Sequence, residues 1–210
     1  VDLASVEFKN CAIQSLRFAD SEAVAVRFDG VQAEELSWTQ SHLVGSYVSG
    51  QIQSGTFARC KIEGTIFSDL TVNHADFQHA FLWGVAFQQC NLAHAIFSGS
   101  IMQAVRFDDC NLTGVNWTGA TLVSANLASS VLTQAVLVNA KADDAIFPIA
   151  VSHLNATGSS LQHADFESCN LSYATFQNAT LIGCDFENAI VLETNFEDAD
   201  LTEATFIGQN

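Results

Sequence analysis

The chain has 210 residues, of which 49% are hydrophobic, and its 23 acidic residues against 7 basic ones give a formal net charge of −16. This excess of negative charge excludes the basic surface that direct nucleic-acid binding requires. No apolar run approaches the ~18–20 residues that a membrane span needs, and no signal-peptide pattern is visible.

From Leu3 onward the sequence repeats every five residues, most clearly where Ala164–Phe206 reads ADFES, CNLSY, ATFQN, ATLIG, CDFEN, AIVLE, TNFED, ADLTE, ATF. Each block starts with a small residue and has an apolar residue, here named the centre, in third place. These two residues can both face inward from one extended segment. The next two residues must turn a corner. A helix does not fit, because five residues drift around an axis with ~3.6 residues per turn.

In chain order the centres advance by five residues within Leu3–Val48, Ile52–Phe147 and Ala156–Phe206. All 41 of these centres are apolar, and 15 of the 16 phenylalanines occupy one. The motif is weakest over Ser21–Ser41, where two centres are alanine, so less regular coils are expected there. The register is otherwise secure along the chain.

Two breaks interrupt the register, near residues 48–52 and 148–155. At the first break one residue is missing from a stretch that contains Gly45, Gly50 and Gly55, and glycine can absorb such an irregularity. The second break begins with the single proline of the chain, Pro148. Because proline lacks the amide N–H that stacked coils share, Pro148–His153 is predicted to form a small protruding loop or bulge.

If each corner turns about a right angle, four blocks close one square coil of about 20 residues, and successive coils stack at ~4.8 Å. About ten coils would form a rod roughly 50 Å long, so residues 1–210 are predicted to form a single solenoid domain. The blocks ADLTE, ADFES, CNLSY and ANLAS resemble the pentapeptide-repeat family. The resemblance implies an all-β fold, the right-handed quadrilateral β-helix of that family.

Neither end of the repeat shows a covering element. Solenoids normally hide their terminal coils, since an exposed coil edge can pair with another chain. We therefore expect either that the sequence is part of a longer chain or that a partner covers the ends. End-to-end association through uncapped terminal coils is left open.

No residue pattern indicates catalysis, a cofactor or a metal. All six cysteines lie two positions before a centre, namely Cys11, Cys60, Cys90, Cys110, Cys169 and Cys184. They are predicted to be free, buried fillers, which fits a reducing cytoplasm. His74 and His94 are expected to stack on one corner, with His79 one corner further, as exposed imidazoles rather than metal ligands. A non-enzymatic protein is expected.

Phe81 is the one phenylalanine that does not occupy a centre, and Trp83 follows two residues later. Both side chains flank the centre Leu82 and should point outward. Ile101 and Val123 are expected to continue these two columns on further coils of the same face. Aromatic side chains in register on a surface suggest a contact patch, so these four residues are candidates for binding a partner protein.

The last third of the chain is acidic, because no basic residue follows Lys141. With 20 residues per coil, Asp165 should stack on Asp185 and Glu167 on Glu187. Such columns of like charge cost stability through repulsion, and these four residues are candidates for binding a basic partner.

Three function classes remain open from the sequence. The first is a non-enzymatic scaffold or adaptor that presents the flat faces of an acidic rod to another protein. The second, implied by the family resemblance, is a DNA mimic that binds a type II topoisomerase such as gyrase. The third is a repeat arm of a larger secreted effector or secretion adaptor, in which case the cytoplasmic localisation expected here would apply only before export.

Overall fold

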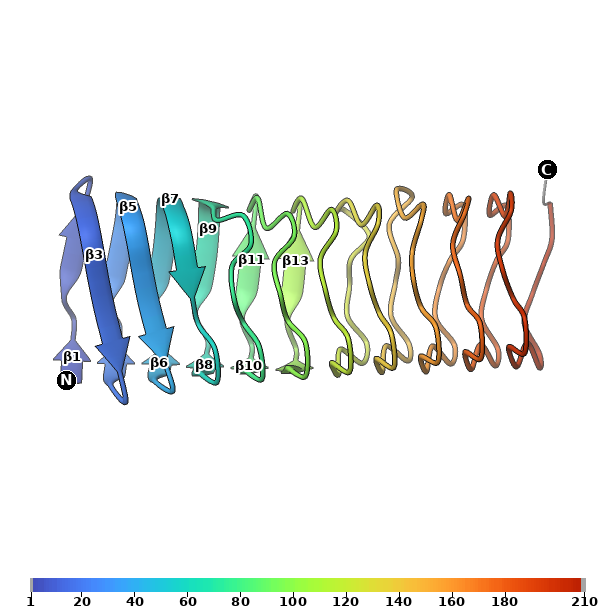
Figure 1. The fold of residues 1–210 in the computed structure, drawn as a ribbon, viewed down its shortest axis with the longest axis horizontal. Helices are drawn as coiled ribbons and strands as arrows, with labels where there is room; N and C mark the ends of the chain where they lie inside the picture. Colours follow the sequence, from blue (N-terminus) through green and yellow to red (C-terminus); the bar gives the residue numbers. More distant parts are fainter. Residues whose placement is uncertain (1, 209–210) are drawn as a thin grey trace.

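The computed structural model describes residues 2–208; Val1, Gln209 and Asn210, which the sequence analysis assigns to the same solenoid, lie outside the described residues. Within this range the regular elements are all β-strands (Figure 1). They are β1 Asp2–Ala4, β2 Glu7–Lys9, β3 Ala12–Ala19, β4 Glu22–Val24, β5 Arg27–Thr39, β6 His42–Val44, β7 Tyr47–Thr56, β8 Lys61–Glu63, β9 Ile66–Thr71, β10 Phe81–Trp83, β11 Ala86–Gln88, β12 Ile101–Gln103 and β13 Arg106–Asp108. Beyond β13 the coils continue as isolated parallel bridges.

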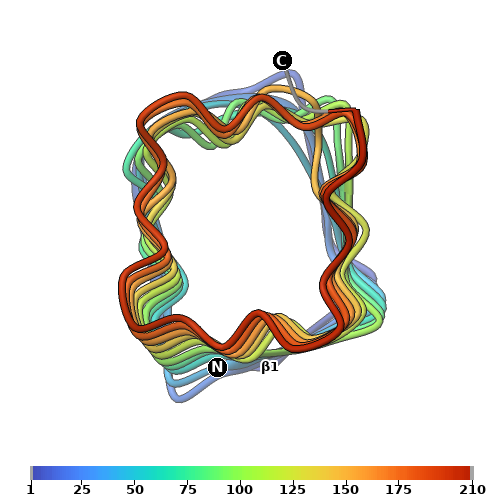
Figure 2. The ribbon, with the colours of Figure 1, turned by 90° about the vertical axis from the view of Figure 1, so that its right-hand side faces the viewer.

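The chain winds into a four-sided, right-handed tube whose successive coils pair in parallel (Figure 2). One column of paired residues runs Asp2, Glu22, His42, Lys61, Phe81, Ile101, Thr121, Lys141, Ser160, Thr180 and Asp200. Each step along this column is one coil, so the rod has about ten coils. The expected quadrilateral β-helix is confirmed.

We number the four faces by the order in which the chain meets them. The first face carries β1, β4, β6, β8, β10 and β12, and the second carries β2, β11 and β13. The third face contains the centres Ile13, Val72 and Leu112, and the fourth contains the centres Phe18, Phe77 and Trp117. The second and fourth faces are opposite each other, as are the first and third.

Corners form because the residue two positions after a centre adopts the left-handed conformation. Arg59, for example, has φ 57° inside a turn closed by a hydrogen bond of 3.3 Å from the Cys60 amide to the Phe57 carbonyl. Glycine, asparagine, aspartate and histidine are common at this position, as expected for a positive φ. The rule fails in the first three coils, where β3, β5 and β7 run without a tight turn from the third face into the fourth, and again at Ser129 and Ile149 on the second face.

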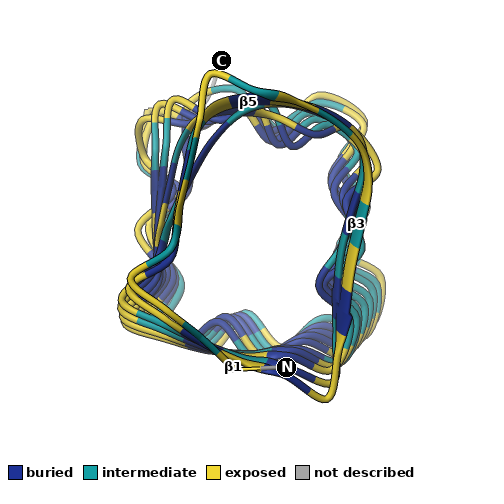
Figure 3. Cartoon of the chain, turned by 90° about the vertical axis from the view of Figure 1, so that its left-hand side faces the viewer, coloured by how far each residue is buried: buried dark blue, intermediate teal, exposed yellow. Residues whose placement is uncertain are grey.

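The core is built from aromatic and aliphatic columns. On the second face Phe67, Phe87 and Phe107 stack with ring centroids 4.9 Å apart, and on the fourth face Phe57, Phe77 and Phe97 stack at 4.7 Å. The two columns meet edge to face across the tube. Mainly aliphatic centres fill the other two faces. Buried residues line the inner side of the coils between the two ends, whereas the centres of the terminal coils are mostly only partly buried (Figure 3).

At the first break the pairing of β5 with β7 shifts between Phe28 and Val31, so that Phe28 pairs with Val48 but Val31 pairs with Gly50. This coil is therefore one residue short. Because this coil has one residue fewer, the backbone of Gly50 lies close against the backbone of Val31. Gly50 adopts φ 122°, which an L-residue with a side chain rarely adopts.

The predicted protruding loop at Pro148–His153 is wrong. The pattern resumes at Val151, which is fully buried as a centre of the third face, and the break is a block shortened by one residue. Proline is tolerated because it follows a centre directly. On the coils below and above, the amide at this position donates to an Asn126 or Asp165 side chain rather than to a neighbouring coil. Pro148 therefore removes no coil-to-coil hydrogen bond.

Candidate interaction surfaces

The described residues contain no group of three or more His, Cys, Asp and Glu side chains that could hold a metal ion. His74 and His94 stack on one corner with ring centroids 5.1 Å apart, as expected. Among residues 2–208 no helix is long and apolar enough to cross a membrane. The described surface also has exposed patches and shallow hollows.

The first face carries the aromatic patch. β10 pairs with β12, which places Phe81 beside Ile101 and Trp83 beside Gln103. Trp83 is 55% exposed and Ile101 44% exposed, while Phe81 is half-buried. Val123 lies two coils beyond Trp83, with Gln103 between them, so it extends the patch but is not a direct neighbour of the Trp83 indole.

Beside Trp83 lies a shallow, mainly apolar hollow of about 350 Å³, lined by Val44, Gly45, Glu63, Gly64, Trp83 and Gly84. Three of these residues are glycines at the same corner on successive coils, each with positive φ. The missing side chains leave a strip of open backbone along one side of the indole. Sequence reasoning missed this strip, although the three glycines at 45, 64 and 84 were a signal for it.

A charged cluster borders the hollow on the coils that precede Trp83, and it consists of Glu22, His42, Lys61 and Glu63. Lys61 forms an ion pair with Glu63, and the hydrogen bond from Lys61 lowers the pKa of that carboxyl below its usual value. His42 lies 3.6 Å from Glu63 and 4.0 Å from Glu22. The carboxylate beside Trp83 is therefore already partly neutralised within the protein.

The acidic candidates lie on the second face. Asp165 pairs with Asp185 on the next coil. Each aspartate also has a structural task, because Asp165 Oδ1 accepts a hydrogen bond of 2.9 Å from the Glu167 amide, and Asp185 Oδ1 accepts one of 2.8 Å from the Glu187 amide. Thus the aromatic and acidic candidates occupy adjacent faces at different heights of the rod, and the structure does not join them into one site.

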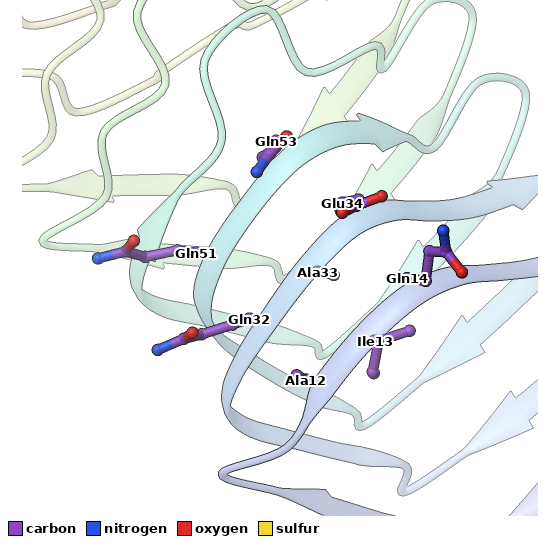
Figure 4. Close-up of a pocket in the computed structure, with 8 residues that line it drawn as sticks. All are labelled: Ala12, Ile13, Gln14, Gln32, Ala33, Glu34, Gln51 and Gln53. Atoms are coloured by element: carbon purple, nitrogen blue, oxygen red, sulfur yellow. The ribbon is translucent and has the colours of Figure 1, made fainter.

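A larger hollow of about 500 Å³ lies on the third face, across β3, β5 and β7. Figure 4 shows Gln32 and Gln51 along one side of it, with Gln14, Glu34 and Gln53 along the other. The lining is rich in amides, which both donate and accept hydrogen bonds. Glu34 is the one ionised group among the lining residues.

The cysteines are free thiols, and all except Cys11 are buried. Cys60 Sγ donates to the Trp38 carbonyl at 2.7 Å, and Cys184 Sγ donates to the Leu161 carbonyl at 2.8 Å. Burial raises the pKa of Cys60 to about 11 and the pKa of Cys184 to about 12. Cys60 and Cys184 therefore fill space in the core and react poorly as nucleophiles.

A thiol titration checks this assignment. In the native protein at pH 8 we expect one fast-reacting thiol, that of Cys11, because the other five are buried. For Cys60, Cys169 and Cys184, with pKa values near 11–12, the thiolate fraction is also only about one in a thousand or less. The hydrogen bond with Cys110 lowers the pKa of Cys90, so burial alone protects that thiol. Denatured, unreduced protein should give six thiols. A Cys11→Ser variant should lose the fast phase. Two or more fast thiols, or four or fewer in total after denaturation, would contradict the buried-filler assignment.

The family model described as pentapeptide repeats matches this chain in eight copies, at residues 73–109, 106–141, 152–188 and 181–208. No curated protein matches the chain significantly.

Three solved structures are similar to this chain at low identity. HetL of the cyanobacterium Nostoc sp. strain PCC 7120, involved in heterocyst differentiation regulation, is 23% identical over 92% of this chain and 88% of its own, with a TM-score of 0.37. QnrB1, a plasmid-mediated fluoroquinolone resistance protein, is 16% identical over 97% and 92%, with a TM-score of 0.39. A protein of the Arabidopsis thaliana thylakoid lumen is 25% identical over 49% and 62%, with a TM-score of 0.21.

The family matches extend over more than half of the chain. They begin at residue 73, on the third face of the fourth coil, where regular corners replace the long N-terminal strands. Parallel coils of about 20 residues, apolar centres that stack inside a four-sided tube and positive φ angles at the corners agree with them. The chain belongs to the pentapeptide-repeat family.

Proposed function

We propose that this protein is a non-enzymatic interaction scaffold that binds a partner protein through its first face. The observation that carries the proposal is the exposed indole of Trp83 beside an open strip of glycine backbone. An aromatic side chain next to a hollow is the usual form of an interface anchor, since it buries a large area with little loss of conformational entropy. Phe81 and Ile101 extend the apolar area across the next coil.

The second face supports a further contact with a basic partner. Asp165, Glu167, Asp185 and Glu187 present four carboxylates on two successive coils. A partner bound here should lose affinity as salt rises, because screening acts over ~8 Å at physiological ionic strength. A DNA-mimic role is less well supported, since duplex DNA carries a charge about every 1.7 Å, more densely than these columns with their ~4.8 Å spacing.

The test compares the proteins that immobilised variants recover from an extract of the source cells. Phe81→Ser/Trp83→Ser should abolish recovery of a first-face partner, because both anchors are removed while the buried centre Leu82 remains. Asp165→Asn/Asp185→Asn should reduce recovery of a basic partner only at low salt. Asparagine keeps the oxygen that accepts the hydrogen bonds from the Glu167 and Glu187 amides, so the fold is preserved.

The matched control for the aromatic variant is Ile66→Ser/Ile146→Ser, which removes exposed apolar side chains from the second face. It should leave the recovered set unchanged. Equal recovery by wild type and the Phe81/Trp83 variant, with both folded by circular dichroism, would show that the patch is ordinary surface.

A further inference from the structure

Charge is distributed very unevenly among the four faces. Over residues 85–184 the charged side chains all lie on the first or second face or at the corner that follows each, namely Arg106, Asp108, Asp109, Lys141, Asp143, Asp144, Asp165 and Glu167. The third face has no Asp, Glu, Lys or Arg at positions 51–54, 71–74, 91–94, 111–114, 131–134, 150–153 and 170–173, and its titratable side chains there are His74, His94, His153 and Tyr173. A protein with a net charge of −16 thus has one face without such residues over seven successive coils. The fourth face lacks them over only five coils, between Asp76 and Glu197.

The fold does not require this neutrality. The residue before many centres accepts a hydrogen bond from the amide two positions later. On the second face an aspartate does this, as in Asp165 and Asp185. On the third face asparagine does the same, with Asn111 Oδ1 3.1 Å from the Thr113 amide and Asn170 Oδ1 3.0 Å from the Ser172 amide. Aspartate and asparagine are equivalent for this bond, yet the third face contains only asparagine.

Stacking of amides explains only part of the preference. Asn111 Nδ2 donates to Asn91 Oδ1 at 3.1 Å, and aspartate could not extend such a ladder as a donor. Asn170, however, lies between Ala150 and Ile190 and has no amide neighbour in its column. Asp165 and Asp185 also stack directly on each other, so the fold tolerates a charged pair. The absence of charge on the third face therefore points to a contact.

We propose that the third face binds the third face of a second copy of this chain. Two copies that meet through the first or second face would bring carboxylates together, and like charges across an interface are strongly unfavourable. The third face avoids this cost and offers paired donors and acceptors in its asparagine and glutamine amides, together with the exposed Val131. A two-fold axis would pair this surface with itself.

The size of the face sets the expected strength. Seven coils at ~4.8 Å give a strip ~34 Å long, and an edge of about five extended residues is ~16 Å wide. Each copy would bury about 500 Å², which is below the ~800 Å² per partner of standard stable complexes. We therefore expect a dimer with a dissociation constant in the range of about 10–100 μM.

Sedimentation equilibrium on wild type and an Asn91→Asp/Asn170→Asp variant tests the proposal. Both substitutions keep the side-chain oxygens that accept hydrogen bonds from the Ala93 and Ser172 amides and from Asn111 Nδ2, so the fold is retained. In a symmetric dimer they place four carboxylates in the contact. Dimerisation should weaken at least tenfold, and added salt should restore part of it, because ions screen the repulsion.

The matched control is Gln88→Glu/Asn126→Asp, which adds the same two charges to the second face, where Asn126 caps its turn in the same way. It should change the dissociation constant less than twofold. A wild type that stays monomeric up to about 500 μM would overturn the proposal. So would equal weakening by the control, or a tenfold weakening by Asn116→Asp/Asn155→Asp on the fourth face with no effect of the third-face variant. Because the proposed first-face partner uses different residues, either proposal can fail without the other.

Discussion

Replacing Gly50 with alanine is expected to lower the free energy of unfolding by more than ~3 kcal/mol, because a strained backbone conformation and a hard steric clash add together. Gly50 has φ 122°, and a Cβ atom there would lie 2.0 Å from the carbonyl oxygen and 2.6 Å from the amide nitrogen of Val31. Both contacts are with backbone, which cannot move without breaking the pairing of β5 with β7. Urea unfolding followed by circular dichroism measures the loss.

Gly64→Ala is the matched control for the Gly50 variant. Gly64 also has a positive φ, 54°, but no atom lies within 4 Å of the position its Cβ would take. It should therefore lose only the ~1–2 kcal/mol of the left-handed conformation. Similar losses for the two variants would show that the coil shortened by one residue can relax, and that the close approach to Val31 is not a fixed feature of the fold.

The repeat made most of the architecture predictable. A residue that recurs every five positions returns to the same face after about 20, so the neighbour of almost any outward residue follows from counting. In this way the sequence placed Phe81 beside Ile101 and Asp165 beside Asp185, and the structure has both pairs. The buried phenylalanine columns follow from the same counting.

Counting fails wherever the corner conformation changes. The straight passage of β3 and β5 from the third face to the fourth could not be predicted, because Ser15 and Glu35 occupy corner positions that elsewhere turn. In the structure Glu35 instead accepts hydrogen bonds from Arg17 and Ser15. The Arg17 guanidinium holds the pKa of that carboxyl below its usual value.

The second break shows a different limit of sequence reasoning. Pro148 was interpreted as the start of a small protruding loop or bulge, whereas its effect depends on which amide hydrogen bond it removes. Its position directly after a centre has no coil-to-coil hydrogen bond to lose, as the neighbouring coils show. The hollow beside Trp83 was missed for another reason. Its three glycines are visible in the sequence, but that they share one corner and leave it open depends on the conformation of the coil.

Replacing Phe107 with alanine is expected to cost about 3–5 kcal/mol of unfolding free energy, through lost burial and the cavity that remains. Phe107 is 1% exposed, and its ring stacks on Phe87 at 4.9 Å and meets Phe97 and Trp117 edge to face at 6.0 and 5.7 Å. These rings belong to paired coils, which cannot close the gap without losing their backbone hydrogen bonds. Urea unfolding gives the cost.

The control for the Phe107 variant is Val131→Ala, which shortens an exposed side chain and should cost less than ~1 kcal/mol. Because each coil contacts only its neighbours, the Phe107 cavity should also weaken coupling between the two ends of the rod. Hydrogen exchange of the variant should therefore speed up most in the coils around residues 87–127 and least near the ends of the chain. A uniform increase along the rod would show that the solenoid unfolds as one unit, and a cost below ~1.5 kcal/mol would show that its core closes around the gap.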